Sequence, residues 1–138
     1  MGAEITELFG TVPPGFVLDA TLGGGGHSEL LLDRWPHLSV LGIDRDQRAL
    51  AAARQRLARF GDRVRTFHTR FDGLAHAMEA LAIDTLSGAL FDLGVSSHQL
   101  DEAERGFSYR FAAPLDMRMD TEQQWSAADV VNGYPLDE

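Results

Sequence analysis

The sequence predicts an α/β fold in which short parallel strands alternate with helices. Apolar runs bounded by turn residues, as in residues 15–20 and 38–44, have the length and composition of buried strands. Residues 64–69 and 87–94 are two further candidates. Alternation of strand and helix over this length favours right-handed βαβ units. We therefore expect a doubly wound parallel sheet with the strand order 3-2-1-4.

Helices are predicted between the strands from apolar residues that recur at helical spacing. One helix occupies the stretch before Gly61, which is expected to end it. Another has Phe71 on its apolar face and Asp72 as a candidate N-cap. A short helix is expected to begin at Ser126, where Asp129 stands at the third position of a partial capping box.

Composition places the chain among globular proteins and excludes several kinds of site. It has 138 residues, 44% of them hydrophobic and 24% charged, which suits one ordinary domain. There is no cysteine, so disulfides and thiolate metal sites are excluded, and the five histidines lack the spacing of metal ligands. No apolar run reaches the roughly 20 residues of a membrane span, and the start does not resemble a signal peptide. We expect a cytoplasmic protein without a membrane segment.

Two features suggest that the sequence is part of a larger protein. Four strands are about half of a doubly wound sheet, and the fourth strand would present an exposed edge, through which a homodimer is expected. From about residue 94 to residue 120 the periodicity is lost, which predicts a long functional loop. The formal net charge of −9 argues by itself against a nucleic-acid partner.

A run of four glycines lies in the predicted turn between the first strand and the next helix, in VLDATLGGGGHSELL. Glycine permits positive φ and lets a ligand approach the backbone closely, and the following helix N-terminus offers free N–H groups. The spacing Gly23-x-Gly25-x-x-Ser28 resembles the dinucleotide fingerprint with serine in the third place. The segment is therefore predicted to bind the polar part of a nucleotide-like ligand; a flexible surface loop is the alternative.

Two acidic residues near this turn help to identify the ligand. Asp44 ends the second strand about 20 residues after the glycines, where an acidic side chain accepts the hydroxyls of a ribose. Its alternative role is the N-cap of the next helix. Asp19 directly precedes the turn, and a carboxylate there attracts a ligand that carries sulfonium and ammonium groups. This favours S-adenosylmethionine over a nicotinamide dinucleotide, although half of a dinucleotide-dependent oxidoreductase remains an alternative.

Longer motifs resemble one known family. LDATLGGGGHS, GIDRD, FDLGVSSHQLDEAERGFSY and PLDMRMD closely resemble the bacterial small-subunit rRNA cytosine-N4 methyltransferases of the MraW or RsmH family, over residues 16–131. The resemblance implies a Rossmann-like class I methyltransferase fold that binds S-adenosylmethionine and methylates the exocyclic amine of a cytidine. It also implies that residues 1–138 are the N-terminal portion of such a domain, without its later strands and inserted helical domain. With that part absent, this chain is expected to bind rRNA weakly or not at all.

The resemblance also implies which residues form the site. The residues carried over as cofactor ligands are Gly25, Gly26, His27, Asp44, Phe71, Asp92 and Gln99. Phe71 would pack on the adenine; its alternative is a core aromatic residue that opens a helix. Asp92 is also the candidate catalytic residue, because a carboxylate that accepts the N–H bonds of the cytosine amine would aim its nitrogen at the methyl group.

The long loop contains further candidates with two interpretations. Arg105, Phe107 and Tyr109 could contact target RNA, because aromatic rings stack on a flipped base, or they could pin the loop. Arg118 lies between two methionines and could cover the methyl end of the cofactor or pack locally. A non-catalytic interaction domain is the remaining alternative for the chain. Four consecutive glycines argue against it, because a domain that only mediates interactions does not need them.

Overall fold

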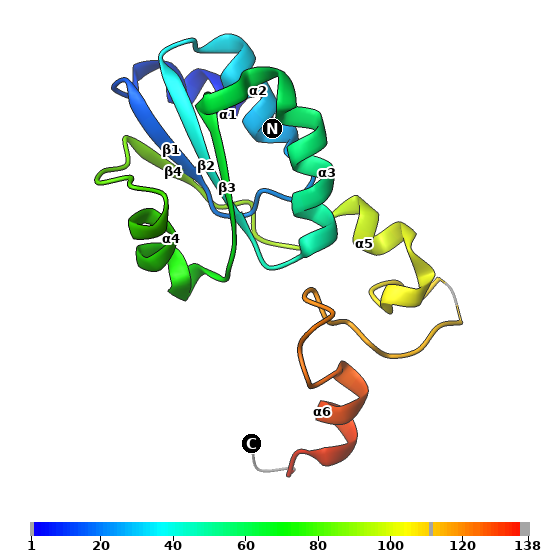
Figure 1. Ribbon diagram of the computed structural model, residues 1–138. Helices are drawn as coiled ribbons and strands as arrows, with labels where there is room; N and C mark the ends of the chain where they lie inside the picture. Colours follow the sequence, from blue (N-terminus) through cyan, green and yellow to red (C-terminus); the bar gives the residue numbers. More distant parts are fainter. Residues whose placement is uncertain (1, 111, 136–138) are drawn as a thin grey trace. The chain divides into compact units, whose positions relative to one another are not determined.

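Four parallel strands form a sheet in the first part of the chain (Figure 1). The computed structural model describes residues 2–110 and 112–135. The strand order is β3-β2-β1-β4, as predicted. Val17 of β1 stands opposite Val40 of β2 and Gly88 of β4, and Val40 stands opposite Val64 of β3. The strands are β1 (Gly15–Asp19), β2 (Leu38–Asp44), β3 (Val64–His68) and β4 (Gly88–Leu90).

The chain divides into two compact units, Met1–Leu93 and Gly94–Glu138. The first unit contains the sheet with its helices, and the described residues of the second, 94–110 and 112–135, form two short α-helices and a 3-10 turn. The α-helices of the first unit are α1 (Gly2–Leu8), α2 (Gly26–Arg34), α3 (Gln47–Leu57) and α4 (Leu74–Ala80). Those of the second are α5 (Ser97–Asp101) and α6 (Ala127–Gly133). The 3-10 segments are Phe9–Thr11, Ala58–Arg63, Phe71–Gly73 and Ala103–Arg105.

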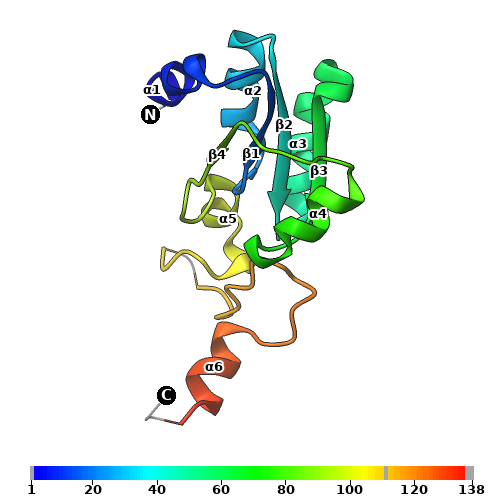
Figure 2. The same ribbon diagram turned by 90° about the vertical axis from the view of Figure 1, so that its left-hand side faces the viewer.

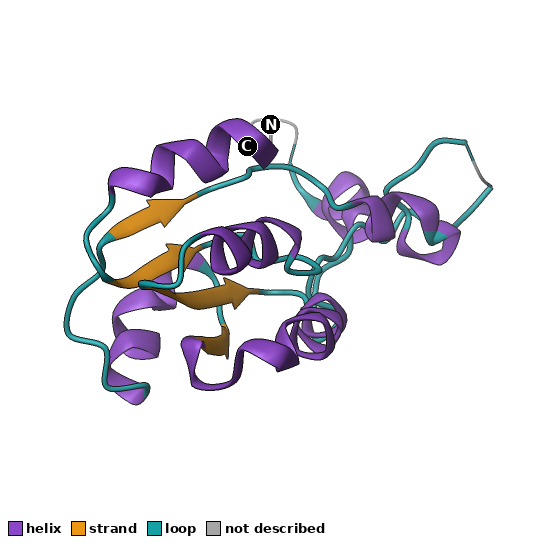
Figure 3. Ribbon diagram, turned by 90° about the horizontal axis from the view of Figure 1, so that it is seen from above, coloured by secondary structure: helices purple, strands orange, loops and turns teal. Residues whose placement is uncertain are grey.

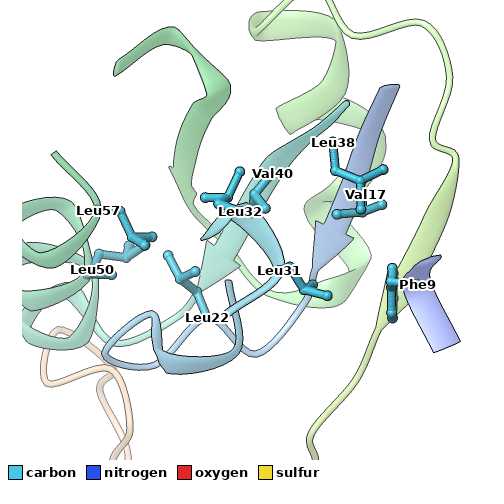
Figure 4. Close-up of a cluster of buried hydrophobic side chains, with 10 residues drawn as sticks. Phe9, Val17, Leu22, Leu31, Leu32, Leu38, Val40, Leu50 and Leu57 are labelled. Atoms are coloured by element: carbon cyan, nitrogen blue, oxygen red, sulfur yellow. The ribbon is translucent and has the colours of Figure 1, made fainter. Parts of the chain in front are cut away.

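Helices cover both faces of the sheet, and each face has its own core (Figures 1 and 3). Along β1, Val17 belongs to the cluster that α2 and α3 complete, whereas Leu18 belongs to the cluster on the α4 side. The first cluster includes Leu31, Leu50 and Leu57, all fully buried (Figure 4). A sheet covered on both faces needs apolar residues at successive positions, which explains the continuous apolar runs in the sequence.

Three predicted details differ from the structure. The fourth strand was expected over residues 87–94 but is limited to Gly88–Leu90, so Asp92 lies two residues beyond its end. Asp46, not Asp44, is the N-cap of α3, where its side chain accepts hydrogen bonds from the next helical N–H groups. Asp72 does not cap α4, because it lies inside a 3-10 turn and its carboxylate is 3.8 Å from Arg70.

Two other helix boundaries agree with the sequence or refine it. The helix before Gly61 ends at Leu57, and the chain continues as a 3-10 segment in which Gly61 has φ +54°. Ser126 and Asp129 form a complete capping box at α6. Helix α1 was not predicted; it lies beside α2 (Figure 2), and Trp35 donates its indole hydrogen to the carbonyl oxygen of Thr6 at 2.8 Å.

In the second unit, Arg105 holds the loop together. Its side chain is buried, and the guanidinium donates to the carbonyl oxygens of Arg118 and Met119 at 3.1 and 2.9 Å. Met117 donates its N–H to the carbonyl of Arg105 and has φ +57°, an uncommon conformation for a side chain of this size. Arg105 therefore pins the loop. Tyr109, in contrast, is 97% exposed. No described helix is long and apolar enough to cross a membrane.

Candidate functional site

The glycine turn connects the end of β1 to α2 and needs glycine for two reasons. Gly23 and Gly25 have φ of +51° and +79°, a region that L side chains rarely adopt. A Cβ on Gly25 would also lie 3.1 Å from Leu57 and 3.3 Å from Ala53 of α3. Gly25 is the N-cap of α2, and Gly26 begins the helix. The turn therefore packs directly against α3 and presents the first N–H groups of α2 at the carboxyl edge of the sheet.

The buried side chain of Asp19 stabilises this turn. Its side chain is only 2% exposed, and its carboxylate accepts the hydroxyl hydrogen of Ser28 at 2.7 Å and the N–H of Thr21 at 3.3 Å. Burial raises the pKa of Asp19 above its ordinary value of 3.8, while the bonds from Ser28 and Thr21 act in the opposite direction. Its buried position assigns the carboxylate to the interior of the turn. Asp19 therefore has almost no surface with which to contact a ligand, and its attraction of a cationic ligand stays a prediction.

The side chain of Asp44 binds the backbone of the glycine turn. Its Oδ2 accepts the N–H of Gly23 at 2.8 Å, and its Oδ1 accepts the N–H of Asp46 at 2.9 Å. Each carboxylate oxygen can accept a further hydrogen bond, so both remain able to bind hydroxyl groups. The side chain is partly exposed at the end of β2. Asp44 therefore connects the end of β2 to the glycine turn that follows β1.

His27 and Asp92 meet at the start of α2, although 65 residues separate them in the sequence. His27 Nε2 lies 3.1 Å from Asp92 Oδ2, and the Asp92 N–H donates to Thr21 Oγ1 at 2.7 Å. The other ring nitrogen of His27 is buried and has no hydrogen-bond partner among the described residues. The contact with Asp92 therefore orients the ring, and the carboxylate of Asp92 remains about half exposed.

Two exposed aromatic rings lie beyond the ends of β3 and β4. Phe71 and Phe91 are 51% and 50% exposed, with ring centroids 5.6 Å apart and ring planes at 74°. Phe71 is therefore not a core residue, and the alternative interpretation of this position is wrong. Phe71 begins a 3-10 turn directly after the end of β3.

Six of the seven predicted cofactor residues lie at this edge of the first unit: Gly25, Gly26, His27, Asp44, Phe71 and Asp92. Gln99 belongs to the second unit, where its side chain is buried and its Oε1 accepts the N–H of Ser96 at 3.0 Å. Sequence reasoning missed the roles of Thr21 and Phe91. Thr21 lies within the glycine motif itself, and Phe91 directly precedes Asp92, so the motifs already chosen contained both residues.

The described residues contain no group of three or more histidine and acidic side chains that could hold a metal ion. The edge instead offers carboxylates, backbone N–H groups and aromatic rings. Such a set suits a ligand that combines hydroxyl groups with a flat base, as a nucleoside does.

Comparison with known proteins identifies close relatives. The model of the MraW methylase family matches residues 1–138. A Kocuria rhizophila protein named ribosomal RNA small subunit methyltransferase H is 58% identical over 118 residues, which cover 86% of this chain and 36% of the relative. Its namesake from Pseudarthrobacter chlorophenolicus is 56% identical over 137 residues, 99% of this chain and 41% of the relative. The chain thus spans less than half the length of these relatives.

A solved structure shares the fold. The crystal structure of an rRNA methylase from Streptococcus thermophilus matches with a TM-score of 0.51 at 23% identity. The match covers 67% of this chain and 52% of that one. It supports the Rossmann-like arrangement of strands and helices that the sheet order shows.

Proposed function

Because the chain belongs to the MraW methylase family, we propose that residues 1–138 form the S-adenosylmethionine-binding part of an enzyme that methylates cytidine N4 in small-subunit rRNA. The relatives' name supports the class of reaction and substrate. The observation that carries the proposal is the bond from Gly23 to Asp44, which places a carboxylate with spare acceptor capacity beside an open glycine turn. Ribosomal subunits are cytoplasmic, and we infer the same location for this protein.

The residues at the edge fit this cofactor. The remaining lone pairs of Asp44 would accept the two ribose hydroxyls, and the exposed ring of Phe71 would lie against the adenine. The first N–H groups of α2, which begins at Gly26 after the N-cap Gly25, would face the methionine end, next to His27. The role of Gln99 as a cofactor ligand stays a prediction. The proposal covers the whole of residues 1–138, including the predicted functional segment at about 94–120, which is not all loop because it contains α5 and the 3-10 turn Ala103–Arg105.

Asp92 is the group that we propose acts on the amine. When bound, S-adenosylmethionine supplies a methyl group on a positively charged sulfur. His27 holds Oδ2 of Asp92, while Oδ1 accepts no hydrogen bond from the described residues and could accept an N–H of the cytosine amine. This contact would localise the nitrogen lone pair and aim it at the methyl carbon, so that positioning supplies most of the rate. The same carboxylate would receive the proton that the amine loses.

The first test is calorimetric titration of the purified chain with S-adenosylmethionine. We expect saturable binding that is lost in Asp44→Ala and weakened in Asp44→Asn, which keeps one acceptor oxygen. Titration with NAD provides the comparison, because binding of NAD instead would support the oxidoreductase alternative. A folded chain that binds neither ligand would contradict the proposed cofactor site and favour a non-catalytic domain.

Turnover tests the assignment of Asp92. The assay follows methyl transfer to small-subunit rRNA or assembled small subunits, with Asp92→Ala beside the wild-type sequence. Because the chain carries a net charge of −9, we propose that it binds rRNA feebly without a longer protein, so the variant is best measured in a relative that includes the remaining length. Turnover within a few-fold of wild type in Asp92→Ala would remove Asp92 from the mechanism.

A further inference from the structure

We propose that Phe91 is a second aromatic residue of the adenine site and forms a two-ring contact surface with Phe71. The inference rests on the proposed function, because it assumes that an adenine-containing cofactor binds at this edge. It adds to the site a residue that precedes Asp92 and has so far been given a contact with Phe71 but no ligand.

The backbone around Phe91 is held in place by the glycine turn. On one side, the carbonyl oxygen of Leu90 accepts the N–H of Ala20 at 2.9 Å. On the other side, the N–H of Asp92 donates to Thr21 Oγ1 at 2.7 Å. Phe91 is thus fixed between two hydrogen bonds to consecutive residues that follow β1. A ring on a backbone held in this way is a pre-organised contact and loses little freedom when a ligand binds.

Phe71 links the Phe91 ring to Asp44, the residue proposed to bind the ribose. The N–H of Thr69 donates to the backbone carbonyl of Asp44 at 3.1 Å, and Phe71 follows two residues later. The Phe71 ring then contacts the Phe91 ring in an edge-to-face arrangement, with centroids 5.6 Å apart. A base attached to a ribose held by Asp44 would therefore meet Phe71 first and Phe91 beside it.

Exposure distinguishes this pair from the other aromatic side chains described in the first unit. Phe9 is buried, and Phe16, Trp35, Phe60 and Phe67 are partly buried against the two core clusters. Phe71 and Phe91 are each about half exposed. Their shared surface lies at the carboxyl edge of the sheet, where ligands of doubly wound folds bind. An adenine ring covering it would remove apolar surface of both residues from water.

The alternative occupant is the target cytosine. Amino-methyltransferases that carry an Asp/Asn-Pro-Pro-aromatic motif have an aromatic residue after the acid, whereas Leu93, Gly94 and Val95 follow Asp92 here. Phe91 precedes the acid and contacts the residue assigned to adenine. These two facts favour adenine.

The experiment measures binding of S-adenosylmethionine and of adenosine to the purified chain and to Phe91→Ala, Phe91→Leu and Phe91→Tyr. Loss of aromatic stacking on a base is expected to lower the affinity for both ligands about tenfold in Phe91→Ala. Phe91→Leu keeps apolar bulk without a ring, so its affinity for both ligands should lie between those of wild type and Phe91→Ala. Phe91→Tyr keeps the ring and should bind both ligands as wild type does. Leu93→Ala is the matched control, because Leu93 is 72% exposed two residues away, and it should bind as wild type does. Circular dichroism checks that each variant is folded.

The outcomes separate this inference from the proposed function. If wild type binds S-adenosylmethionine and folded Phe91→Ala binds it equally well, the inference is wrong and the proposed function stands. If Phe91→Ala keeps cofactor affinity but loses affinity for cytidine, the ring serves the target base and the inference is again wrong. If the folded wild-type chain binds no adenine ligand, both proposals fail. Phe91→Leu keeps the test valid if the alanine variant does not fold.

Discussion

Ser28 donates its hydroxyl hydrogen to Asp19 at 2.7 Å beneath the glycine turn, and both side chains are buried. This bond joins the end of β1 to the first turn of α2, so it holds the two elements between which the cofactor is proposed to bind. Asp19 has its raised pKa at this position because burial disfavours the ionised carboxylate. Stability of the turn is therefore linked to pH.

Asp19 is expected to make the free energy of unfolding fall as pH rises above 3.8. Between that ordinary value and the raised pKa of the folded state, the folded protein keeps a proton that the unfolded chain releases. The contribution is fully present below this window and is lost as pH rises through it. Urea unfolding over a pH series measures the difference in the free energy of unfolding between wild type and Asp19→Asn. As pH rises, the asparagine variant should become more stable relative to wild type. Parallel curves would show that Asp19 titrates alike in both states.

Gly25→Ala should destabilise the fold and abolish S-adenosylmethionine binding. The alanine would be strained at φ +79° and its Cβ would press on Leu57 and Ala53, a cost of about 1–3 kcal/mol for the backbone conformation alone. Gly61→Ala is the matched control, since Gly61 also has positive φ but no atom lies within 4 Å of an added Cβ. Thermal unfolding and calorimetric titration should show lost stability in both variants and lost binding only in Gly25→Ala. Normal cofactor affinity in folded Gly25→Ala would separate the turn from the site.

Arg118→Lys should raise the pKa of Asp116. Arg118 donates to both carboxylate oxygens, at 2.9 and 2.7 Å, and this pairing lowers the pKa of Asp116 to about 2. Stability from the pair is present above the ordinary 3.8 and is lost as pH falls toward 2. Lysine cannot reproduce the two-pronged contact. Carboxyl NMR titration of Asp116 measures the change, with Arg110→Lys as control; an unchanged titration would assign the low pKa to another cause.

A homodimer through the free edge of β4 remains a prediction. An unpaired strand edge favours association, and a charged side chain on it opposes association. Sedimentation velocity over a concentration series should show a dimer for wild type and a shift to monomer for Ala89→Lys, since Ala89 is exposed on β4. Ala75→Lys, on the exposed side of α4, is the control. A wild-type monomer at every concentration would contradict the prediction.

Much of the fold followed from local pattern. The strand order was expected from the alternation of strands and helices, and Ser126 with Asp129 was recognised from the spacing of a capping box. The predictions of helix N-caps were wrong where the local sequence is compatible with more than one structure. Asp44 and Asp46 are both suitable N-caps by type, and only the backbone geometry at the end of β2 selects Asp46. Asp72 failed as a cap because the chain first forms a 3-10 turn.

The sequence by itself determined the class of protein and the position of the glycine turn, because both depend on short-range spacing and on residue types that only certain backbone conformations accept. The tertiary structure decided which residues meet. Gly23 and Asp44 lie 21 residues apart, and His27 and Asp92 lie 65 apart, yet each pair is in hydrogen-bonding distance. The physical reason is the parallel sheet, which brings the carboxyl ends of distant strands to one edge. Burial then separates Asp19, which supports the turn, from Asp44 and Asp92, which can reach a ligand.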